Sequence, residues 1–309
     1  MKKRLSTLQV LAISALVVAV TAILPFFVSG YILGLLTVAF YFGVFAMAWD
    51  LLFGFAGEVN FGPTFLIGVG AYTAGILDNL YQPPIIVCLA AGTLAAIVGG
   101  LVLALPALRL RGPYFGLITL VAVLILSNFV VVAAELTGGE IGLTVPDVIT
   151  VNADTNYWLA LGFMAVSGGI LYFLSRSPIG LILQASGQDP VQTNALGFNV
   201  SKHKLAAFIV SAFFSGLAGA LMVFYFGVAS VGTFVDLTVA VQIIVAAVIG
   251  GRRTIIGGVL GAVFLIGANE ALRPVGDLST FVVSAIALVV VLLFPSGFLG
   301  LLSRLRGAE

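Results

Sequence analysis

Long, almost uninterrupted apolar stretches recur along the whole sequence and restrict what this chain can fold into. A helix needs about 20 apolar residues to cross the hydrocarbon core of a bilayer. Only 8% of the residues are charged, against about 25% in soluble domains. We therefore predict an all-α polytopic membrane protein with a single transmembrane domain over residues 1–309. Its ten expected spans are 8–28, 33–53, 63–80, 85–106, 114–134, 157–175, 204–227, 236–250, 254–272 and 279–301.

The distribution of basic residues predicts the orientation of these spans. If the N-terminus is cytoplasmic and all ten stretches cross, 12 of the 13 lysines and arginines lie in cytoplasmic segments, and only Arg273 lies outside. We therefore expect both termini in the cytoplasm. A net charge of +1 gives no basic surface for nucleic acid. The acidic residues of the opposite side are Asp78, Glu135, Glu140, Asp147, Asp154, Asp236 and Asp277.

Residues 176–204 form the longest predicted cytoplasmic connection. Short helices are expected over 180–185 and 190–196, with breaks at Gly187, at Asp189-Pro190 and at Gly197. Asp189 suits the N-cap of the second helix, with Pro190 in its first turn. The pattern predicts a compact helical elbow that contacts another protein, and a solvated loop is the alternative.

The stretch GQDPVQTNALGFNVSKHKLAAFIVSAFFSGLAGAL (187–221) resembles the cytoplasmic coupling loop and following helix of the branched-chain amino-acid ABC permeases. Four other stretches resemble the same family in the same order: 57–77, 108–120, 137–143 and 249–265. The Arg-Leu-Arg-Gly element at 109–112 resembles the LivM-like subunit. Three residues depart from the family pattern. Gly187 stands where a charge is usual, Asn194 stands where Glu is frequent, and Asn60 replaces a serine.

The resemblance implies the permease subunit of an importer in a prokaryotic inner membrane, for branched-chain amino acids or alternatively for urea or short-chain amides. It also implies several partners in the lipid bilayer: a second homologous permease that shares the pathway, two ATP-binding ATPase subunits and an extracytoplasmic solute-binding protein. The binding protein would contact outer loops that include 135–156. The residues expected to couple the ATPases are Asp189, Pro190, Asn194, Ala195, Gly197 and Asn199.

Two glycine-rich interruptions, 54–63 and 250–258, separate apolar stretches. Irregular backbone at membrane depth must be satisfied by protein or by a water-filled cavity, and paired interruptions indicate a transport pathway. A helix that begins at Pro63 would offer free N–H groups to a carboxylate. Ordinary tight cytoplasmic turns are the alternative, and Asp50 either faces a protein interface or lies at the cytoplasmic surface. The candidate pathway residues are Gly57, Glu58, Asn60, Gly62, Tyr72, Gly250, Gly251 and Gly257.

Other function classes lack the residues that they need. No lysine follows a glycine, so no phosphate-binding P-loop is present and ATP hydrolysis must belong to a partner. His203 is the sole histidine, which excludes multi-histidine metal sites, and no metal or cofactor is expected. An intramembrane enzyme would need paired carboxylates or an activated nucleophile. A stand-alone transporter or channel would need its own coupling residues and would leave 176–204 unexplained.

Overall fold

The computed structural model describes residues 7–107 and 114–275, together with residues 285 and 297. The helices of the first half are α1 (Thr7–Ala22), the 3-10 turn Leu24–Phe26, α2 (Gly30–Asp50), its π-helical extension η2 (Leu51–Ala56), α3 (Pro63–Tyr81), α4 (Ile85–Ala107), α5 (Tyr114–Val132) and α6 (Ala134–Thr137). Those of the second half are α7 (Ala153–Arg176), α8 (Pro178–Gln188), α9 (Pro190–Ala195), α10 (Val200–Phe226), α11 (Val231–Phe234), α12 (Leu237–Gly250), α13 (Gly257–Ala271) and the 3-10 turn Arg273–Val275.

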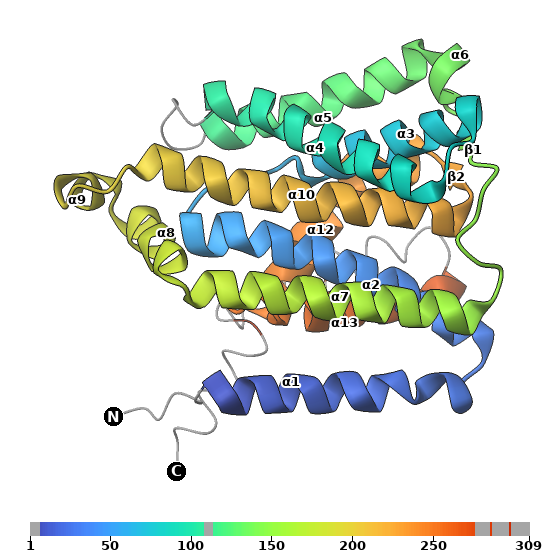
Figure 1. Cartoon of the computed structure of the whole chain (residues 1–309), viewed down its shortest axis with the longest axis horizontal. Helices are drawn as coiled ribbons and strands as arrows, with labels where there is room; N and C mark the ends of the chain where they lie inside the picture. Colours follow the sequence, from blue (N-terminus) through green and yellow to red (C-terminus); the bar gives the residue numbers. More distant parts are fainter. Residues whose placement is uncertain (1–6, 108–113, 276–284, 286–296, 298–309) are drawn as a thin grey trace.

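The long helices run roughly side by side, with α2 and α10 in the middle of the bundle (Figure 1). On one side α10 packs against α3 and α4, and α5 covers these two helices. On the other side α2 packs against α7, α12 and α13. Helix α1 lies at the edge, where Tyr157 and Trp158 of α7 donate hydrogen bonds to the carbonyls of Thr21 and Ala22.

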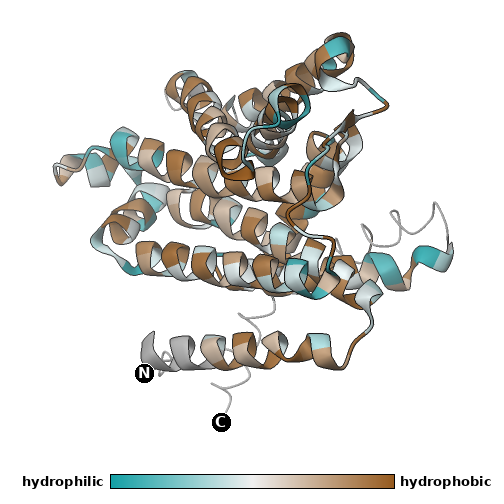
Figure 2. Ribbon diagram, turned by 45° about the vertical axis from the view of Figure 1, so that its right-hand side comes forward, coloured by the Kyte–Doolittle hydropathy of each residue, from teal (hydrophilic) through white to brown (hydrophobic). Residues whose placement is uncertain are grey.

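The helices are apolar along their length, and hydrophilic residues gather at the ends of the bundle (Figure 2). Six helices of the described chain are long and apolar enough to cross a membrane: Gly30–Ala56, Ile85–Pro106, Tyr114–Val132, Ala153–Arg176, Val200–Phe226 and Val231–Gly250. Shorter apolar helices add Ser14–Phe26 and Gly257–Ala271. Each of the first nine predicted stretches coincides with a helix, and the third of them (63–80, α3) is not among the apolar helices just named. The tenth, 279–301, falls almost entirely outside the described residues.

Small residues allow the central helices to approach closely. A Cβ atom at Gly70 of α3 would lie only 2.7 Å from the Cα of Gly216 in α10. Helices in a bilayer associate through such close contacts because lipid gives no hydrophobic drive for them to meet. The two glycines therefore allow α3 and α10 to approach so closely that no side chain fits between them.

At one end of the bundle two short strands join distant connections. Strand β1 (Leu143–Thr144) pairs antiparallel with β2 (Val228–Ala229), with Leu143 opposite Ala229. The all-α prediction did not include these strands. The connection before α7 is also held to the end of α3, because Asp78 accepts a hydrogen bond from the backbone N–H of Asp147. The opposite end of the bundle carries α8 and α9 (Figure 1).

Candidate functional site at the α8–α9 end

Side-chain caps define the helical elbow between α7 and α10. Ser177 caps α8, Asp189 caps α9 through the N–H groups of Val191 and Gln192, and Asn199 caps α10 through Lys202. The predicted Asp189 cap, with Pro190 in the first turn, is thus present. The predicted break at Gly187 is wrong, because α8 continues to Gln188 and ends only where Asp189 becomes extended.

The tip of the elbow is exposed and largely uncharged. Asn194, Ala195 and Gly197 are all exposed, and Gly197 has a φ of 89° that favours glycine. Beside them Val191 and Leu196 each keep 75% of their surface accessible. Large apolar side chains presented together on a protruding segment are typical of a contact surface for another protein.

The two glycine-rich interruptions meet at the base of the elbow, and Asp50 joins them. Asp50 lies at the end of α2 and is only 2% exposed. Its carboxylate accepts hydrogen bonds from the backbone N–H groups of Arg253 (3.0 Å), Thr254 (3.1 Å) and Ile255 (3.1 Å). Asp50 therefore satisfies the irregular backbone between α12 and α13 from inside the protein.

The connection between α12 and α13 in turn satisfies the end of α2. The Nε of Arg253 donates to the carbonyl of Gly54 at 2.7 Å. The guanidinium of Arg252 lies 4.3 Å from the centre of the Phe53 ring. Asp50 at the end of α2 thus satisfies the backbone N–H groups of the second interruption, and an arginine of that interruption satisfies a carbonyl of the first, as irregular backbone in a membrane protein requires.

Residues of the first interruption also contact the elbow. Gly57, with a φ of 74°, packs against Gly187 so closely that a Cβ on Gly57 would lie 2.8 Å from the Cα of Gly187. Next to this contact, Lys204 of α10 forms an ion pair with Glu58. A glycine contact and an ion pair therefore attach the elbow to the end of α2. The contact also explains the absence of a charged side chain at Gly187.

We expect the Glu58–Lys204 pair to contribute measurably to this attachment. Both side chains are mostly buried, so Lys204→Met should reduce the free energy of unfolding by about 1–2 kcal/mol. Thermal unfolding in detergent, carried out as a double-mutant cycle with Glu58→Gln, measures the pairwise part. A coupling free energy near zero would show that the pair is not a fixed attachment.

The remaining candidate pathway residues have varied surroundings. Asn60 is buried, and its side chain accepts a hydrogen bond from the N–H of Gly62, which precedes α3. The carbonyl of Asn60 accepts a hydrogen bond from the indole of Trp49. Tyr72 lies further along α3, away from the interruptions, and its buried hydroxyl has no hydrogen-bond partner in the described part of the chain. Asn60 therefore shapes the turn, and Tyr72 is not part of the cluster.

Gly250, Gly251 and Gly257 form the turn between α12 and α13. Gly250 and Gly257 face each other without room for a Cβ atom on either residue, and Gly251 has a φ of 120°. These glycines allow the sharp reversal of the backbone that brings residues 253–255 onto Asp50. The sequence signal for them was the glycine content, but nothing in the sequence indicated that this turn would meet the first interruption.

Comparison with known proteins finds a family whose model matches most of this chain. Residues 31–294 match the family described as branched-chain amino acid transport system / permease component. This chain belongs to that family. It is therefore a multi-pass membrane protein of the permease type, and the family predicted from the motifs is confirmed.

Individual permeases from bacteria show how far the similarity extends. The branched-chain amino acid permease LivM of Salmonella typhimurium is 26% identical over 325 residues, which cover 94% of this permease and 75% of LivM. BraD of Pseudomonas aeruginosa is 28% identical over 290 residues, which cover 86% of this permease and 93% of BraD. The ribose import permease RbsC of Haemophilus influenzae is 30% identical over 169 residues, which cover 53% of this permease and 48% of RbsC.

Proposed function

We propose that this permease is the membrane subunit of an ABC importer for branched-chain amino acids in a prokaryotic inner membrane. The observation that carries the proposal is the elbow formed by α8 and α9, which protrudes from the bundle with an exposed apolar tip. Membership of the permease family supports the interpretation of this elbow as part of a transport system. LivM and BraD, which are branched-chain amino acid permeases, support the choice of solute.

In the proposed topology both termini are cytoplasmic and the α8–α9 end faces the cytoplasm. The contacts at that end support it. They join residues from three segments that the basic-residue pattern places inside: Glu58, Arg253 and Lys204. The segments that the same pattern places outside include β1 and β2, which lie at the opposite end of the bundle (Figure 1). The outer connection over 135–156 would receive an extracytoplasmic binding protein.

The proposed mechanism transmits ATPase movement through the base of the elbow. Two ATPase subunits dock, one on each permease of a pair, and their closure on ATP pushes the tip of the elbow. Since α8 is packed on η2 through Gly187 and Gly57, the push reaches the end of α2 and then, through Asp50, the turn before α13. The two permeases would thereby alternate between outward-open and inward-open states around a shared pathway.

Co-purification tests this proposal directly. A tag on this permease should recover a second permease and a Walker-motif ATPase from the native membrane after gentle extraction. The recovered assembly, in liposomes with its binding protein, should take up leucine only when ATP is present. Urea and a short-chain amide belong in the same uptake panel, because they are the alternative solutes. A chain that is recovered alone and transports without ATP would contradict the importer.

Gly197→Arg is expected to uncouple ATP hydrolysis from uptake. No atom lies within 4 Å of a Cβ at this position, so arginine fits without a steric clash, although the φ of 89° strains any side chain there. A bulky charge at the apolar tip should nevertheless prevent docking and reduce ATP-dependent uptake about tenfold or more, since an unpaired charge in an interface weakens binding by several kcal/mol. Gly197→Ala is the matched control, because it introduces the same backbone strain with only a methyl group. Equal uptake by the two variants would show that the tip of the elbow is not part of the docking surface.

A further inference from the structure

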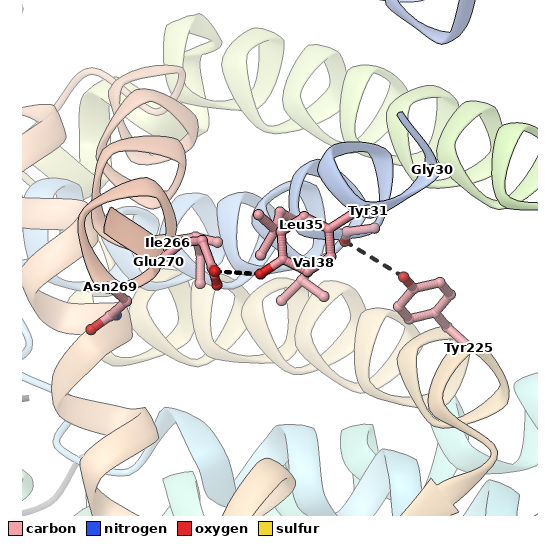
Figure 3. Close-up of a pocket in the computed structure, with 9 residues that line it drawn as sticks. Gly30, Tyr31, Leu35, Val38, Tyr225, Ile266, Asn269 and Glu270 are labelled. Atoms are coloured by element: carbon pink, nitrogen blue, oxygen red, sulfur yellow. Dashed lines mark hydrogen bonds between the residues drawn. The ribbon is translucent and has the colours of Figure 1, made fainter. Parts of the chain in front are cut away.

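A groove opens on the side of the bundle where α2, α10 and α13 meet (Figure 3). Its volume is about 440 Å³, within the range of about 300–1,000 Å³ that is typical of small-molecule sites. Leu35 and Val38 of α2 and Ile266 of α13 form an apolar wall, and Tyr225 of α10 closes one side. The groove could thus accept a small branched aliphatic group.

One end of the groove is polar. Tyr31 donates a hydrogen bond to Glu270 Oε1, and Arg273 donates one to the Tyr31 hydroxyl at 2.8 Å (Figure 3 shows the Tyr31–Glu270 bond). Arg273 also lies 3.4 Å from Glu270. Within the described chain, neither Glu270 Oε2 nor the Asn269 amide has a hydrogen-bond partner. Among the described residues, one carboxylate oxygen of Glu270 therefore remains to bind a ligand.

The Arg273–Glu270 ion pair adds little to the stability of the fold. The Arg273 side chain is 70% exposed, and an exposed ion pair contributes little to stability. Glu270 lies one residue before the end of α13, where the helix dipole disfavours a negative charge. A residue that opposes its local electrostatic preference beside an open groove indicates a binding role.

We propose that this groove is a solute subsite of the permease that binds a small branched-chain amino acid as a zwitterion. Glu270 Oε2 accepts a hydrogen bond from the α-ammonium group, and Arg273 pairs with the α-carboxylate. The apolar wall of Leu35, Val38 and Ile266 contacts the branched side chain. This inference rests on the proposed importer function and adds that the permease itself recognises the ammonium group.

Protection of an introduced cysteine tests the subsite without any transport step. Ile266→Cys would be made together with Cys88→Ala, which removes the free cysteine of this chain. The tagged native assembly would then be treated with a water-soluble methanethiosulfonate. Leucine at about ten times its Kd should slow the labelling about tenfold by simple occupancy. 4-Methylpentanoate, which lacks the ammonium group, should leave the labelling unchanged.

Glu270→Gln in the same background identifies the group that recognises the ammonium. The loss of a charge-assisted hydrogen bond weakens binding about tenfold, so the same leucine concentration should now slow labelling only about twofold. Asp236→Asn removes another acidic charge, from the N-cap of α12 outside the groove, and should keep the full protection. Leu260→Cys, an exposed position on α13 outside the groove, should show no protection.

The experiment distinguishes failure of the proposed subsite from failure of the proposed importer function. An assembly that contains an ATPase and takes up leucine, but shows no protection at residue 266, would overturn the subsite and leave the importer intact. Absence of labelling even without leucine would show that the groove is closed in the assembly, which also overturns the subsite. An assembly that takes up no amino acid would instead contradict the proposed function.

Discussion

Asp50→Ala is expected to reduce the free energy of unfolding by about 3–5 kcal/mol, because it removes a buried carboxylate that accepts hydrogen bonds from three backbone N–H groups. The affected residues are Arg253, Thr254 and Ile255, which join α12 to α13. Two of them, Arg253 and Ile255, already have a positive φ, so the connection has little intrinsic preference for its native conformation. The expected result is a large fall in thermal stability in detergent, measured by fluorescence-detected size exclusion, together with loss of uptake.

Asp236→Ala is the matched control for this experiment. Asp236 also accepts a backbone hydrogen bond with its carboxylate, but it accepts only one, from the N–H of Thr238 in the first turn of α12, and it is half-exposed. Its loss should reduce stability by about 1 kcal/mol, as is usual for an N-cap. Asp50→Asn should fall between the two, since it keeps one oxygen acceptor. Equal effects of Asp50→Ala and Asp236→Ala would contradict the role of Asp50 as the connection between the two interruptions.

Gly187→Ala should displace the elbow from the bundle. A methyl group there would lie 2.7 Å from the carbonyl oxygen of Phe55 and 2.9 Å from the backbone nitrogen of Gly57. Both atoms belong to the backbone and cannot rotate away, so α8 must move. Overpacking of this kind reduces the free energy of unfolding by about 1–3 kcal/mol. We expect ATP hydrolysis to continue while uptake falls by an order of magnitude or more, because the push on the elbow no longer reaches α2.

Gly169→Ala is the corresponding control in α7. No atom lies within 4 Å of a Cβ at Gly169, and alanine is preferred over glycine in a helix by about 0.5–1 kcal/mol. The control should therefore keep full uptake and unchanged or slightly higher stability. If Gly187→Ala behaved in the same way, the glycine contact would not transmit ATPase movement.

The helices of this permease were largely predictable from the sequence, and their contacts were not. Apolar length placed α4 and α5 within a few residues of their observed bounds. The Asp189-Pro190 pair predicted the start of α9, because capping is a local interaction. The break at Gly187 was mispredicted because a glycine can lie inside a helix, and the close contact of this glycine with Gly57 comes from a residue 130 positions away in the chain.

The candidate site illustrates the same limit. Glycine content identified both interruptions, and the positions of Glu58 and Asp50 near them were visible in the sequence. The residues that Asp50 and Glu58 contact could not be predicted, because hydropathy and local motifs do not indicate which turns of the chain come together. The groove beside Glu270 was missed entirely, because its residues come from three helices and form no local pattern.

The pairing of the two interruptions also has a consequence for biosynthesis. Asp50 and the N–H groups that it accepts are separated by 203 to 205 positions in the chain. At about 5–20 residues per second of translation, the end of α2 waits roughly 10–40 s before its partner leaves the ribosome. During that interval the carboxylate of Asp50 and the carbonyl of Gly54 must be hydrated or held by the insertion machinery. The nascent permease therefore stays open at the α8–α9 end until α12 and α13 are made, and a chain truncated before residue 253 would expose this unsatisfied end to quality-control proteases.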